Sequence, residues 1–532
     1  MVKTPRFILI AIITTLLTSC AGNSGLWGLP NTPTPLAASP TTAVVATQPL
    51  IPSLAPSPSI TPLMVLPVPG SPTPGMLPSQ PPQATATLPP INTSGPMDVY
   101  QSQSGDTLNA VMNRFGISAD QIISDVVLPP KDALIPIGTL LLIPKRSAAV
   151  EFSPSKRTIP DSEIVLGPAT IGFDIMEYVN VQNGFLAYYT EYVMSGGTLN
   201  GAQAVERLAQ ENSLSPRILL AIIEYESHWV LGKPTNLAQD EYPLGYVDYR
   251  YRGLFRQLMW ASGTLSDGFY RWRSGDLIEL TFIDGSTMRL DPNLNAGTAA
   301  IQYYFSQTHT RTEWEQAVAP SGFPALYAKM FGPTWERSAA FEPAIPDNLT
   351  QPELSLPFVP GKVWAFTGGP HSAWEEKGAL AALDFAPAAD ITGCVESNEW
   401  VVAPAAGVVA RTATGVVILD LDGDGNEQTG WDIMFLHIRS DGKAQQGTVL
   451  QKDDHIGHAS CEGGISTGTH VHIARKYNGE WMLADGPMPF NMDGWIAHKG
   501  LVKYKGTLTK DDKIVEASTS GTFETNVIRA KK

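Results

Sequence analysis

The chain divides into stretches with a clear hydrophobic pattern and stretches with none. Residues 98–146 carry the pattern of a short strand, two helices and a closing strand. Residues 161–342 are mostly helical in pattern, and residues 361–505 show short alternating runs, which indicate strands. The pattern therefore predicts a multidomain chain: a disordered Pro-rich linker, a small βααβ module, a mainly α domain and a C-terminal antiparallel β domain.

The segments that connect or follow these domains have little hydrophobic pattern. Residues 343–360 are rich in proline and are expected to form a linker, and the polar residues 506–532 are expected to be a frayed tail. Alternating runs in the β domain predict strands at 363–366, 400–403, 408–413, 416–421 and 432–438.

The first twenty residues have the pattern of an export signal. Lys3 and Arg6 give a basic start, and residues 7–17 are apolar but too short to span a bilayer. The sequence Leu-Thr-Ser-Cys at 17–20 resembles the lipobox of bacterial lipoproteins, which implies a signal peptide at 1–19 and a lipid on Cys20. The alternative is an ordinary secretory signal with an incidental cysteine. We expect an exported protein, lipid-anchored to the outer face of the cell membrane in the cell envelope.

Residues 20–97 are expected to form a disordered tether. Residues 21–97 contain no charged side chain, and nineteen prolines lie between Pro30 and Pro96. Such a segment cannot bury a core and favours extended geometry, which at about 3.1 Å per residue reaches on the order of 200 Å. It either lifts the later domains off a membrane or serves only as a spacer.

The charge balance excludes one class of partner. The net charge is −15, so the chain is not expected to bind nucleic acid. Export makes a disulfide permissible, and removing Cys20 from the three cysteines leaves one pair, Cys394 and Cys461. A bridge between them would close a long loop and stabilise the domain by roughly 4 kcal/mol in the chain-entropy model.

Residues 98–146 resemble a LysM module. The resemblance is carried by Ser-Gly-Asp-Thr-Leu at 104–108, Arg-Phe-Gly-Ile-Ser at 114–118 and Leu-Leu-Leu-Ile-Pro at 140–144. Ser118 and Gln121 form a capping-box pattern for the second helix, expected at 119–124. The resemblance implies binding to N-acetylglucosamine-containing glycans such as peptidoglycan, and a structural spacer is the alternative.

The helical residues 161–342 contain one carboxylate in an apolar setting. Ser215 can cap a helix whose broad apolar face ends beside Glu226. Desolvation raises the pKa of such a carboxyl, which suits a general acid. The segment resembles the Glu-Ser signature of lysozyme-like transglycosylases, and residues 253–257 and 295–300 resemble that family's second and third motifs. The resemblance implies Glu226 as a single catalytic acid; a lysozyme-like domain that binds glycan without cutting is the alternative.

Two histidines stand two positions apart in the C-terminal domain. His470 and His472 alternate with apolar Val471 and Ile473, so both imidazoles are expected on one face of a strand. Two such imidazoles can hold one metal, or one can bind metal while the other handles a proton. The alternative is a polar strand face with two exposed histidines.

Candidates for the missing ligands lie earlier in the chain. His371 follows the first predicted strand, and thirteen residues later Asp384 stands among apolar neighbours, where a carboxylate is costly unless paired or metal-bound. With one histidine of the 470/472 pair they would fill three positions of a tetrahedral zinc and leave the fourth for water. That water needs a base and an oxyanion donor, tasks that His437 and the remaining histidine can share.

Four short motifs together carry a family resemblance: Pro-His at 370–371, Ala-Leu-Asp-Phe at 382–385, Leu-His-Ile at 436–438 and Thr-Gly-Thr-His-Val-His at 467–472. They resemble the lysostaphin/LytM-type zinc metalloendopeptidases, and the long gap between the first two ligands is nearest to the beta-lytic, staphylolysin-like branch. The resemblance implies Zn²⁺ bound by His371, Asp384 and His472. It implies catalytic roles for His437 and His470, whose division the sequence leaves open.

One acidic segment of the β domain has an ion-binding pattern. Residues 420–425, Asp-Leu-Asp-Gly-Asp-Gly, resemble the opening of a calcium loop. The twelfth position is Trp431, so the bidentate glutamate of an EF-hand is missing. The pattern favours an acidic hairpin turn.

These features predict a cell-wall hydrolase. We expect a zinc-dependent endopeptidase that cleaves peptide bonds in peptidoglycan, is targeted by the LysM module and acts as a monomer. Its partners would be glycan strands and stem peptides, and the membrane through the lipid on Cys20. Two alternatives are a non-catalytic peptidoglycan-binding or amidase-activating protein, and a muramidase or lytic transglycosylase acting through Glu226.

Overall fold

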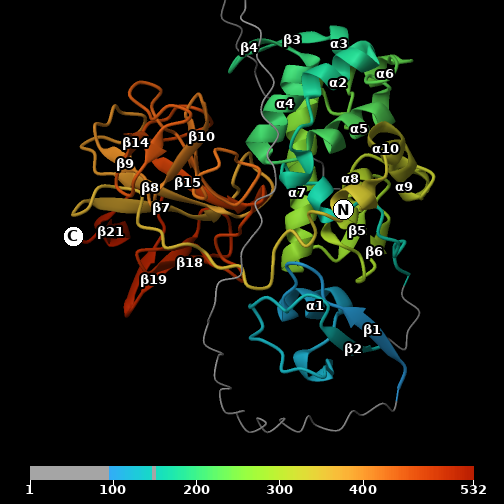
Figure 1. Cartoon of the computed structure of the whole chain (residues 1–532), viewed down its shortest axis with the longest axis horizontal. Helices are drawn as coiled ribbons and strands as arrows, with labels where there is room; N and C mark the ends of the chain where they lie inside the picture. Colours follow the sequence, from blue (N-terminus) through green and yellow to red (C-terminus); the bar gives the residue numbers. More distant parts are fainter. Residues whose placement is uncertain (1–94, 146–150, 532) are drawn as a thin grey trace, which may run out of the picture. The chain divides into compact units, whose positions relative to one another are not determined.

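The computed structural model describes residues 95–145 and 151–531, which all belong to one compact unit, Ala86–Lys532. The predicted signal peptide, Cys20 and nearly all of the predicted tether lie outside the described residues. Three regions follow in chain order: an N-terminal region (95–145), a helical region (151–345) and a β region (354–531) (Figure 1). The predicted multidomain chain with helical and antiparallel β parts is thus confirmed. Among the described helices, none has the length and apolarity needed to cross a membrane.

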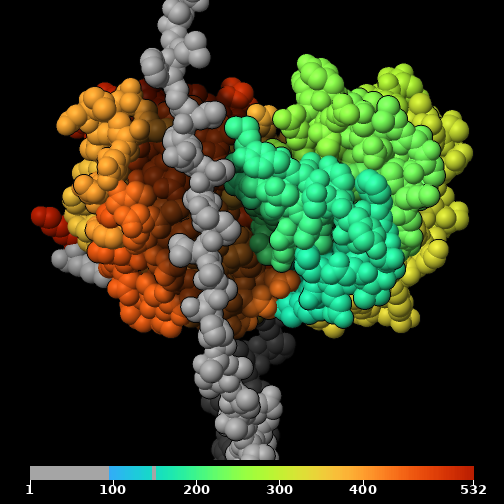
Figure 2. Space-filling view, turned by 90° about the horizontal axis from the view of Figure 1, so that it is seen from above, coloured from blue at the N-terminus to red at the C-terminus, as the bar shows by residue number. Residues whose placement is uncertain are grey.

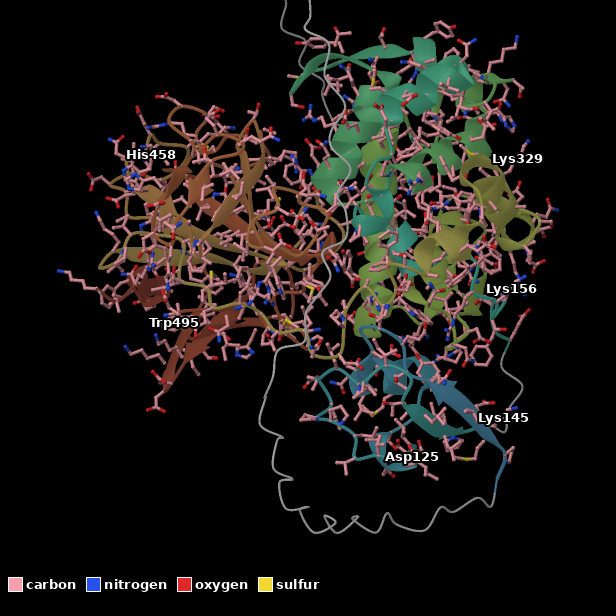
Figure 3. The ribbon with its side chains drawn as sticks, viewed as in Figure 1. Asp125, Lys145, Lys156, Lys329, His458 and Trp495 are labelled. Carbon is pink, nitrogen blue, oxygen red and sulfur yellow. A yellow bond between two sulfur atoms is a disulfide. The ribbon has the colours of Figure 1, made fainter. Side chains whose placement is uncertain are left out.

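The N-terminal region is a two-stranded sheet with helical turns between its strands. In chain order its elements are β1 (Met97–Gln101), α1 (Leu108–Phe115), the 3-10 turn η1 (Ala119–Gln121) and β2 (Leu140–Pro144), with β1 antiparallel to β2. The helix expected at 119–124 is only the single turn η1, although the Ser118 N–H does donate to Gln121 Oε1 at 3.0 Å. The chain leaves the helix early because Ile123 pairs with Leu142 of β2, and Asp125 follows in the connecting loop (Figure 3).

The helical region contains two hairpins among its helices. Its α-helices are α2 (Ile175–Gln182), α3 (Phe185–Tyr188), α4 (Gly201–Asn212), α5 (Pro216–Ser227), α6 (Leu237–Glu241), α7 (Leu254–Ser274), α8 (Ala296–Ser306), α9 (Arg311–Val318), α10 (Phe323–Phe331) and α11 (Thr334–Ser338). Its hairpins are β3 (Thr190–Val193) with β4 (Gly197–Asn200), and β5 (Glu279–Thr281) with β6 (Thr287–Arg289). Short 3-10 turns are η2 (Asp161–Glu163), η3 (Pro168–Thr170) and η4 (Tyr249–Tyr251).

Helix α5 lies in the middle of the helical core. It begins at Pro216, the first helical position that proline tolerates best, and ends where His228 adopts a left-handed conformation (φ 59°). Ile218 and Ile222, one turn apart, are fully buried. Helix α7 packs against α4 and α8 and extends the same core, so the helical pattern of the sequence is realised as a packed bundle.

The β region is built on a large antiparallel sheet with the strand order β13-β10-β11-β12-β15-β8-β7-β21. The strands of this sheet are β7 (Val363–His371), β8 (Ala382–Pro387), β10 (Gly407–Ala413), β11 (Val416–Asp420), β12 (Trp431–Leu436), β13 (Val449–Leu450), β15 (Val471–Tyr477), β16 (Glu480–Trp481), which pairs with β15, and β21 (Asn526–Ile528). A four-stranded sheet contains β17 (Asn491–Met492), β18 (Trp495–Lys499), β19 (Gly506–Lys510) and β20 (Lys513–Glu516), and β9 (Trp400–Val402) pairs with β14 (His455–His458). His458 and Trp495 mark the two smaller sheets in Figure 3.

The central strands are apolar on both faces because each face enters a different core. Leu419 and Ile433 lie in the core of the β region, whereas Ile418, Met434 and Ala474 on the opposite face belong to the core of the helical region. A sheet covered on both faces reads as a continuous apolar run rather than a strict alternation. The helical region therefore supplies the second layer that this sheet needs.

Polar contacts also join the helical and β regions, and Figure 2 shows atoms of both meeting on the face drawn. The Trp481 N–H donates to the Tyr270 hydroxyl at 2.8 Å. The buried guanidinium of Arg273 on α7 lies 3.1 Å from the Glu480 carboxylate. A buried carboxylate and a buried guanidinium each need the other, so this contact specifies how α7 docks on β16.

Two segments expected to lie outside the domains are part of the β region, so those two predictions are wrong. The expected tail, 506–532, forms β19, β20 and β21, and Val527 is fully buried. The end of the expected linker, 343–360, packs Leu356 and Phe358 into the β-region core. The physical reason is long-range pairing: β21 completes the edge of the sheet beside β7, and its partner strand lies far away in sequence.

Candidate functional site

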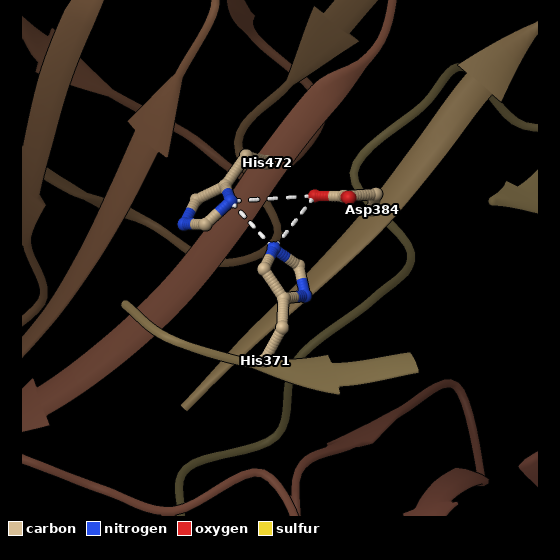
Figure 4. A group of neighbouring side chains, drawn as sticks. All are labelled: His371, Asp384 and His472. Atoms are coloured by element: carbon tan, nitrogen blue, oxygen red, sulfur yellow. Dashed lines mark hydrogen bonds and ion pairs between the residues drawn. The ribbon is translucent and has the colours of Figure 1, made fainter. Parts of the chain in front are cut away.

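Three side chains from three neighbouring strands of the β region converge on one another (Figure 4). His371 ends β7, Asp384 lies on β8 and His472 on β15, directly opposite Asp384 in the register of the two strands. His371 Nε2 lies 3.0 Å from His472 Nδ1, and each of these nitrogens lies 3.3 Å from Asp384 Oδ1. All three residues are buried. The structure thus brings together the three predicted metal ligands.

Hydrogen bonds to backbone carbonyls orient the rings of His371 and His472 so that their lone pairs face each other. His371 Nδ1 lies 2.8 Å from the Gly369 carbonyl, and His472 Nε2 lies 3.0 Å from the Ala373 carbonyl. A carbonyl only accepts, so each of these nitrogens carries the hydrogen. In a neutral imidazole the other nitrogen then presents a lone pair, and both lone pairs face Asp384.

This arrangement fits a tetrahedral metal ion. Ligand atoms about 2.0 Å from a tetrahedral zinc are separated from one another by about 3.3 Å, which matches the triangle of His371, Asp384 and His472. Asp384 Oδ1 is buried and accepts no hydrogen bond from the described residues. A buried carboxylate oxygen that faces only lone pairs is unfavourable without a cation. The backbone carbonyls behind the two rings orient them as the supporting groups of metal-binding histidines do.

Two more histidines stand beside this triangle. His437 directly follows β12 with a left-handed backbone (φ 64°), and its Nδ1 lies 2.9 Å from the Glu462 carbonyl. His470 precedes β15; its Nδ1 lies 2.7 Å from the Gly468 carbonyl and its Nε2 3.7 Å from Asp384 Oδ1. The two rings are 4.5 Å apart. Both imidazoles therefore keep Nε2 available for proton transfer.

Burial and mutual charge determine the protonation of this cluster. Burial, together with the neighbouring His470 and His472, lowers the pKa of His437 to about 3, so this ring is neutral. Burial also lowers the pKa of His472. Burial opposes ionisation of Asp384, but the adjacent imidazoles of His371 and His470 hold the pKa of its carboxyl well below the usual range. Burial thus favours the neutral form of His437 and His472 beside the Asp384 carboxylate, and neutral imidazole and ionised carboxylate are the forms that bind a metal ion.

A disulfide fastens the loops above the site, as predicted. Cys394 and Cys461 are bonded across 67 positions of sequence. The bridge joins the loop that follows β8 to the loop that precedes His470. Thr469 hydrogen-bonds the backbone of Val395 beside it, so the loops are held at two points.

The cleft over the cluster has a volume of about 1980 Å³ and two walls. Ile391 and Ile465 on the β-region side are largely exposed, and Arg207 and Phe255 of the helical region lie on the other side. Tyr504, which stacks on His371 with ring centroids 4.2 Å apart, also lines it. The sequence carried no signal for Tyr504, because the turn that holds it is defined only by the pairing of β18 with β19.

Glu226 is not among the residues that line this cleft. It lies near the end of α5, its side chain is only 10% exposed, and its Oε1 accepts no hydrogen bond from the described residues. Burial, assisted by Glu313, raises the pKa of the Glu226 carboxyl to about 8. The expected desolvation is present, but the carboxyl belongs to a different place in the fold from the histidine cluster.

Comparisons with known proteins cover parts of the chain. Residues 157–344 match the family model described as LasA, N-terminal domain. Among solved structures, an M23 metalloprotease, pseudoalterin, described as from the deep sea, is 20% identical with a TM-score of 0.27, over 32% of this chain and 96% of that one. Csd3 of Helicobacter pylori is 17% identical with a TM-score of 0.17, over 28% of this chain and 35% of that one. The catalytic domain of lysostaphin from Staphylococcus simulans is 19% identical with a TM-score of 0.17, over 23% of this chain and 87% of that one. No curated protein matches the chain.

Proposed function

We propose that the β region is a zinc-dependent endopeptidase that cleaves peptide bonds in peptidoglycan. The observation that carries the proposal is the buried triangle of His371, Asp384 and His472, whose lone pairs converge at the spacing of a tetrahedral ion. Three protein ligands leave one position open, as in catalytic rather than structural zinc sites. When bound, zinc supplies a Lewis acid that polarises the scissile carbonyl and increases the acidity of water.

The residues around the triangle supply the proton chemistry. His437 and His470 are each held by a backbone carbonyl at Nδ1, so their Nε2 atoms are positioned to act. One ring accepts a proton from the attacking water at its Nε2 lone pair. The other, in the protonated form that carries hydrogen on Nε2 as well as on Nδ1, donates to the oxygen that becomes negative in the tetrahedral transition state. The disulfide between Cys394 and Cys461 keeps the loops over these rings in place, which limits the reorganisation required during the reaction.

Several features support peptidoglycan as the substrate. The motifs around the site resemble zinc peptidases of the lysostaphin type, and residues 98–146 resemble a glycan-binding LysM module. The match of the helical region to the LasA N-terminal model agrees with this family. A cleft of about 1980 Å³ is large enough for a branched polymer segment. In this proposal the lipid on Cys20 holds a monomeric enzyme at the outer face of the membrane.

The test uses the zinc-loaded full chain and purified peptidoglycan. We expect release of new amino groups, which a chelator stops and added zinc restores. His472→Ala should abolish both activity and bound zinc, whereas His455→Ala, which removes an exposed histidine stacked on Trp400, should change neither. Activity that survives both chelation and His472→Ala would refute the zinc mechanism.

A second candidate is glycan cleavage through Glu226. The observation that favours it is the buried carboxyl whose pKa is raised to about 8, which keeps it protonated at neutral pH as a general acid requires. Mass spectrometry of digested peptidoglycan separates the two candidates. If the wild type releases anhydro or reducing sugar ends and Glu226→Gln does not, with unchanged peptide products, the glycan-cleaving activity is established. If the wild type releases no such sugar ends, the activity is excluded.

A further inference from the structure

The loop between β11 and β12 gathers an acidic cluster that the proposed peptidase mechanism does not use. Asp420, Asp422 and Asp424 offer carboxylate oxygens that all lie within 4.8 Å of one another. Two oxygens bound to the same Ca²⁺ at 2.3–2.6 Å are separated by at most about 5 Å, so the spacing suits this ion. Acidic clusters are common on protein surfaces, and the spacing alone decides nothing.

A separate observation comes from Asp432 on β12. This residue is fully buried, and neither of its carboxylate oxygens has a hydrogen-bond partner among the described residues. An unpaired buried carboxylate carries a large desolvation penalty. Such a group requires a cation or a proton, and its immediate surroundings show which one is available.

The register of the sheet places Asp432 beside Asp420, the first residue of the acidic cluster. Asp432 pairs directly with Asp420 across β11 and β12, so the two carboxylates stand on the same face about 5 Å apart at Cβ. Asp420 and Asp422 are among the charges that act on Asp432. The Asp422 carboxylate in turn lies against Cα of Gly430, two residues before Asp432, where any Cβ would collide with it. Asp422 thus folds back toward the start of β12.

The nearby cations do not neutralise this cluster. Lys476 stands opposite Asp432 on β15, but its Nζ is bound to Glu427 at 2.8 Å, and Arg411 is bound to the same Glu427. Five carboxylates therefore face two cations, which leaves three formal negative charges around one buried group. Asp422 and Asp424 are exposed, so an ion can enter from solvent.

We propose that this loop is a calcium site, formed by Asp420, Asp422 and Asp424, which Asp432 on the following strand joins as the fourth carboxylate when the ion binds. Asp432 takes the place of the glutamate that an EF-hand supplies at its twelfth position, one residue later in sequence and from a β-strand. Four carboxylates, with waters or carbonyls, reach the six to eight oxygens that Ca²⁺ prefers. The smaller Mg²⁺ keeps most of its waters and is selected against by a site with several carboxylates.

The site has a structural consequence for the same strand. β12 begins at the proposed calcium site and is followed by His437 at its other end. Calcium bound at the loop holds the β11–β12 hairpin together against the repulsion of its carboxylates. The expected effect of calcium is therefore a more stable β region, with zinc content unchanged.

The experiment uses the zinc-loaded full chain and titrates TbCl₃ and CaCl₂. Because Trp431 adjoins Asp432, excitation of tryptophan should produce Tb³⁺ luminescence, which Ca²⁺ displaces and Mg²⁺ at equal concentration does not. Asp422→Asn and Asp432→Asn should each weaken calcium binding by at least about tenfold in calorimetry. Asp512→Asn, in the exposed turn between β19 and β20, is the matched control and should leave it unchanged.

Two further results decide the proposal. Trp431→Phe should remove the luminescence and leave the calorimetric affinity for calcium unchanged, which would locate the ion at this loop. No calcium binding at millimolar concentration, or binding that is equal in Asp422→Asn and the wild type, would overturn the site. An unaltered affinity in Asp432→Asn would overturn it as well, because it would show that the buried carboxylate is neutralised by a proton.

Discussion

Replacing Asp384 by asparagine tests the proposed metal site with the smallest change of shape. The amide keeps the volume of the carboxylate but removes the charge that faces His371 Nε2 and His472 Nδ1, each 3.3 Å away. In the metal-free protein the amide can donate to one of these lone pairs, so the fold should be kept. In the presence of zinc, one of the three protein ligands is lost.

The expected magnitude follows from mass action. A ligand at 1,000 times its Kd stabilises the folded state by about 4.1 kcal/mol. Loss of a supporting group behind a ligand already weakens metal binding about 10–100-fold, so loss of Asp384 itself should weaken it at least about 100-fold. At the same zinc concentration the variant would then gain only about 1.4 kcal/mol. The difference of about 2.7 kcal/mol corresponds to a Tm difference of roughly 5–11 °C for a unit of 150–250 residues.

The assay is thermal unfolding of the full chain with zinc and with chelator, combined with metal analysis. Asp390→Asn is the matched control, because Asp390 is an exposed carboxylate that lines the same cleft. We expect the zinc-dependent rise in Tm to be full in wild type and control and small in Asp384→Asn. Equal stabilisation of Asp384→Asn and wild type by zinc would refute the proposal that this carboxylate is a ligand.

Three other predictions concern stability. Burial raises the pKa of Glu226 from 4.5 to about 8, so the stability contributed by its protonated form is fully present below pH 4.5 and is lost as the pH rises to 8. Glu226→Gln should therefore reduce the fall of the unfolding free energy between pH 4.5 and 8. An equally steep fall in the variant and the wild type would contradict the burial of this carboxyl. Arg273→Met leaves two buried carboxylates without their cation and should lower the unfolding free energy by about 3–5 kcal/mol in urea denaturation. The control Arg271→Met breaks a partly exposed i,i+4 ion pair of the same helix and should lower it by less than about 1 kcal/mol. Equal losses in the two variants would refute the structural role of the buried ion pair. Replacing Cys394 and Cys461 together by serine should lower the unfolding free energy by about 4 kcal/mol. Unaltered thermal unfolding would contradict a stabilising role of the disulfide.

Much of the β region could be predicted from local patterns. The alternation of His470 and His472 with apolar neighbours places both imidazoles on one face, and both lie within 3.7 Å of Asp384 Oδ1. The pairing of Cys394 with Cys461 could also be predicted, because they are the only two cysteines beyond residue 20. The pattern of residues 420–425 predicts a plain turn, because position 431 lacks the glutamate of an EF-hand. The proposed fourth carboxylate, Asp432, lies beside Asp420 only through the register of β11 and β12.

The amino-acid sequence shows which residue types are present, their order, and the face of each strand from which they project. These properties depend on neighbours two to four positions apart, which set the periods of strands and helices. The tertiary structure was needed to show that β7, β8 and β15 lie side by side, that the Gly369 and Ala373 carbonyls orient the two imidazoles, and that β21 completes the edge of the large sheet. Those outcomes depend on pairing between strands far apart in the chain, which no local pattern encodes.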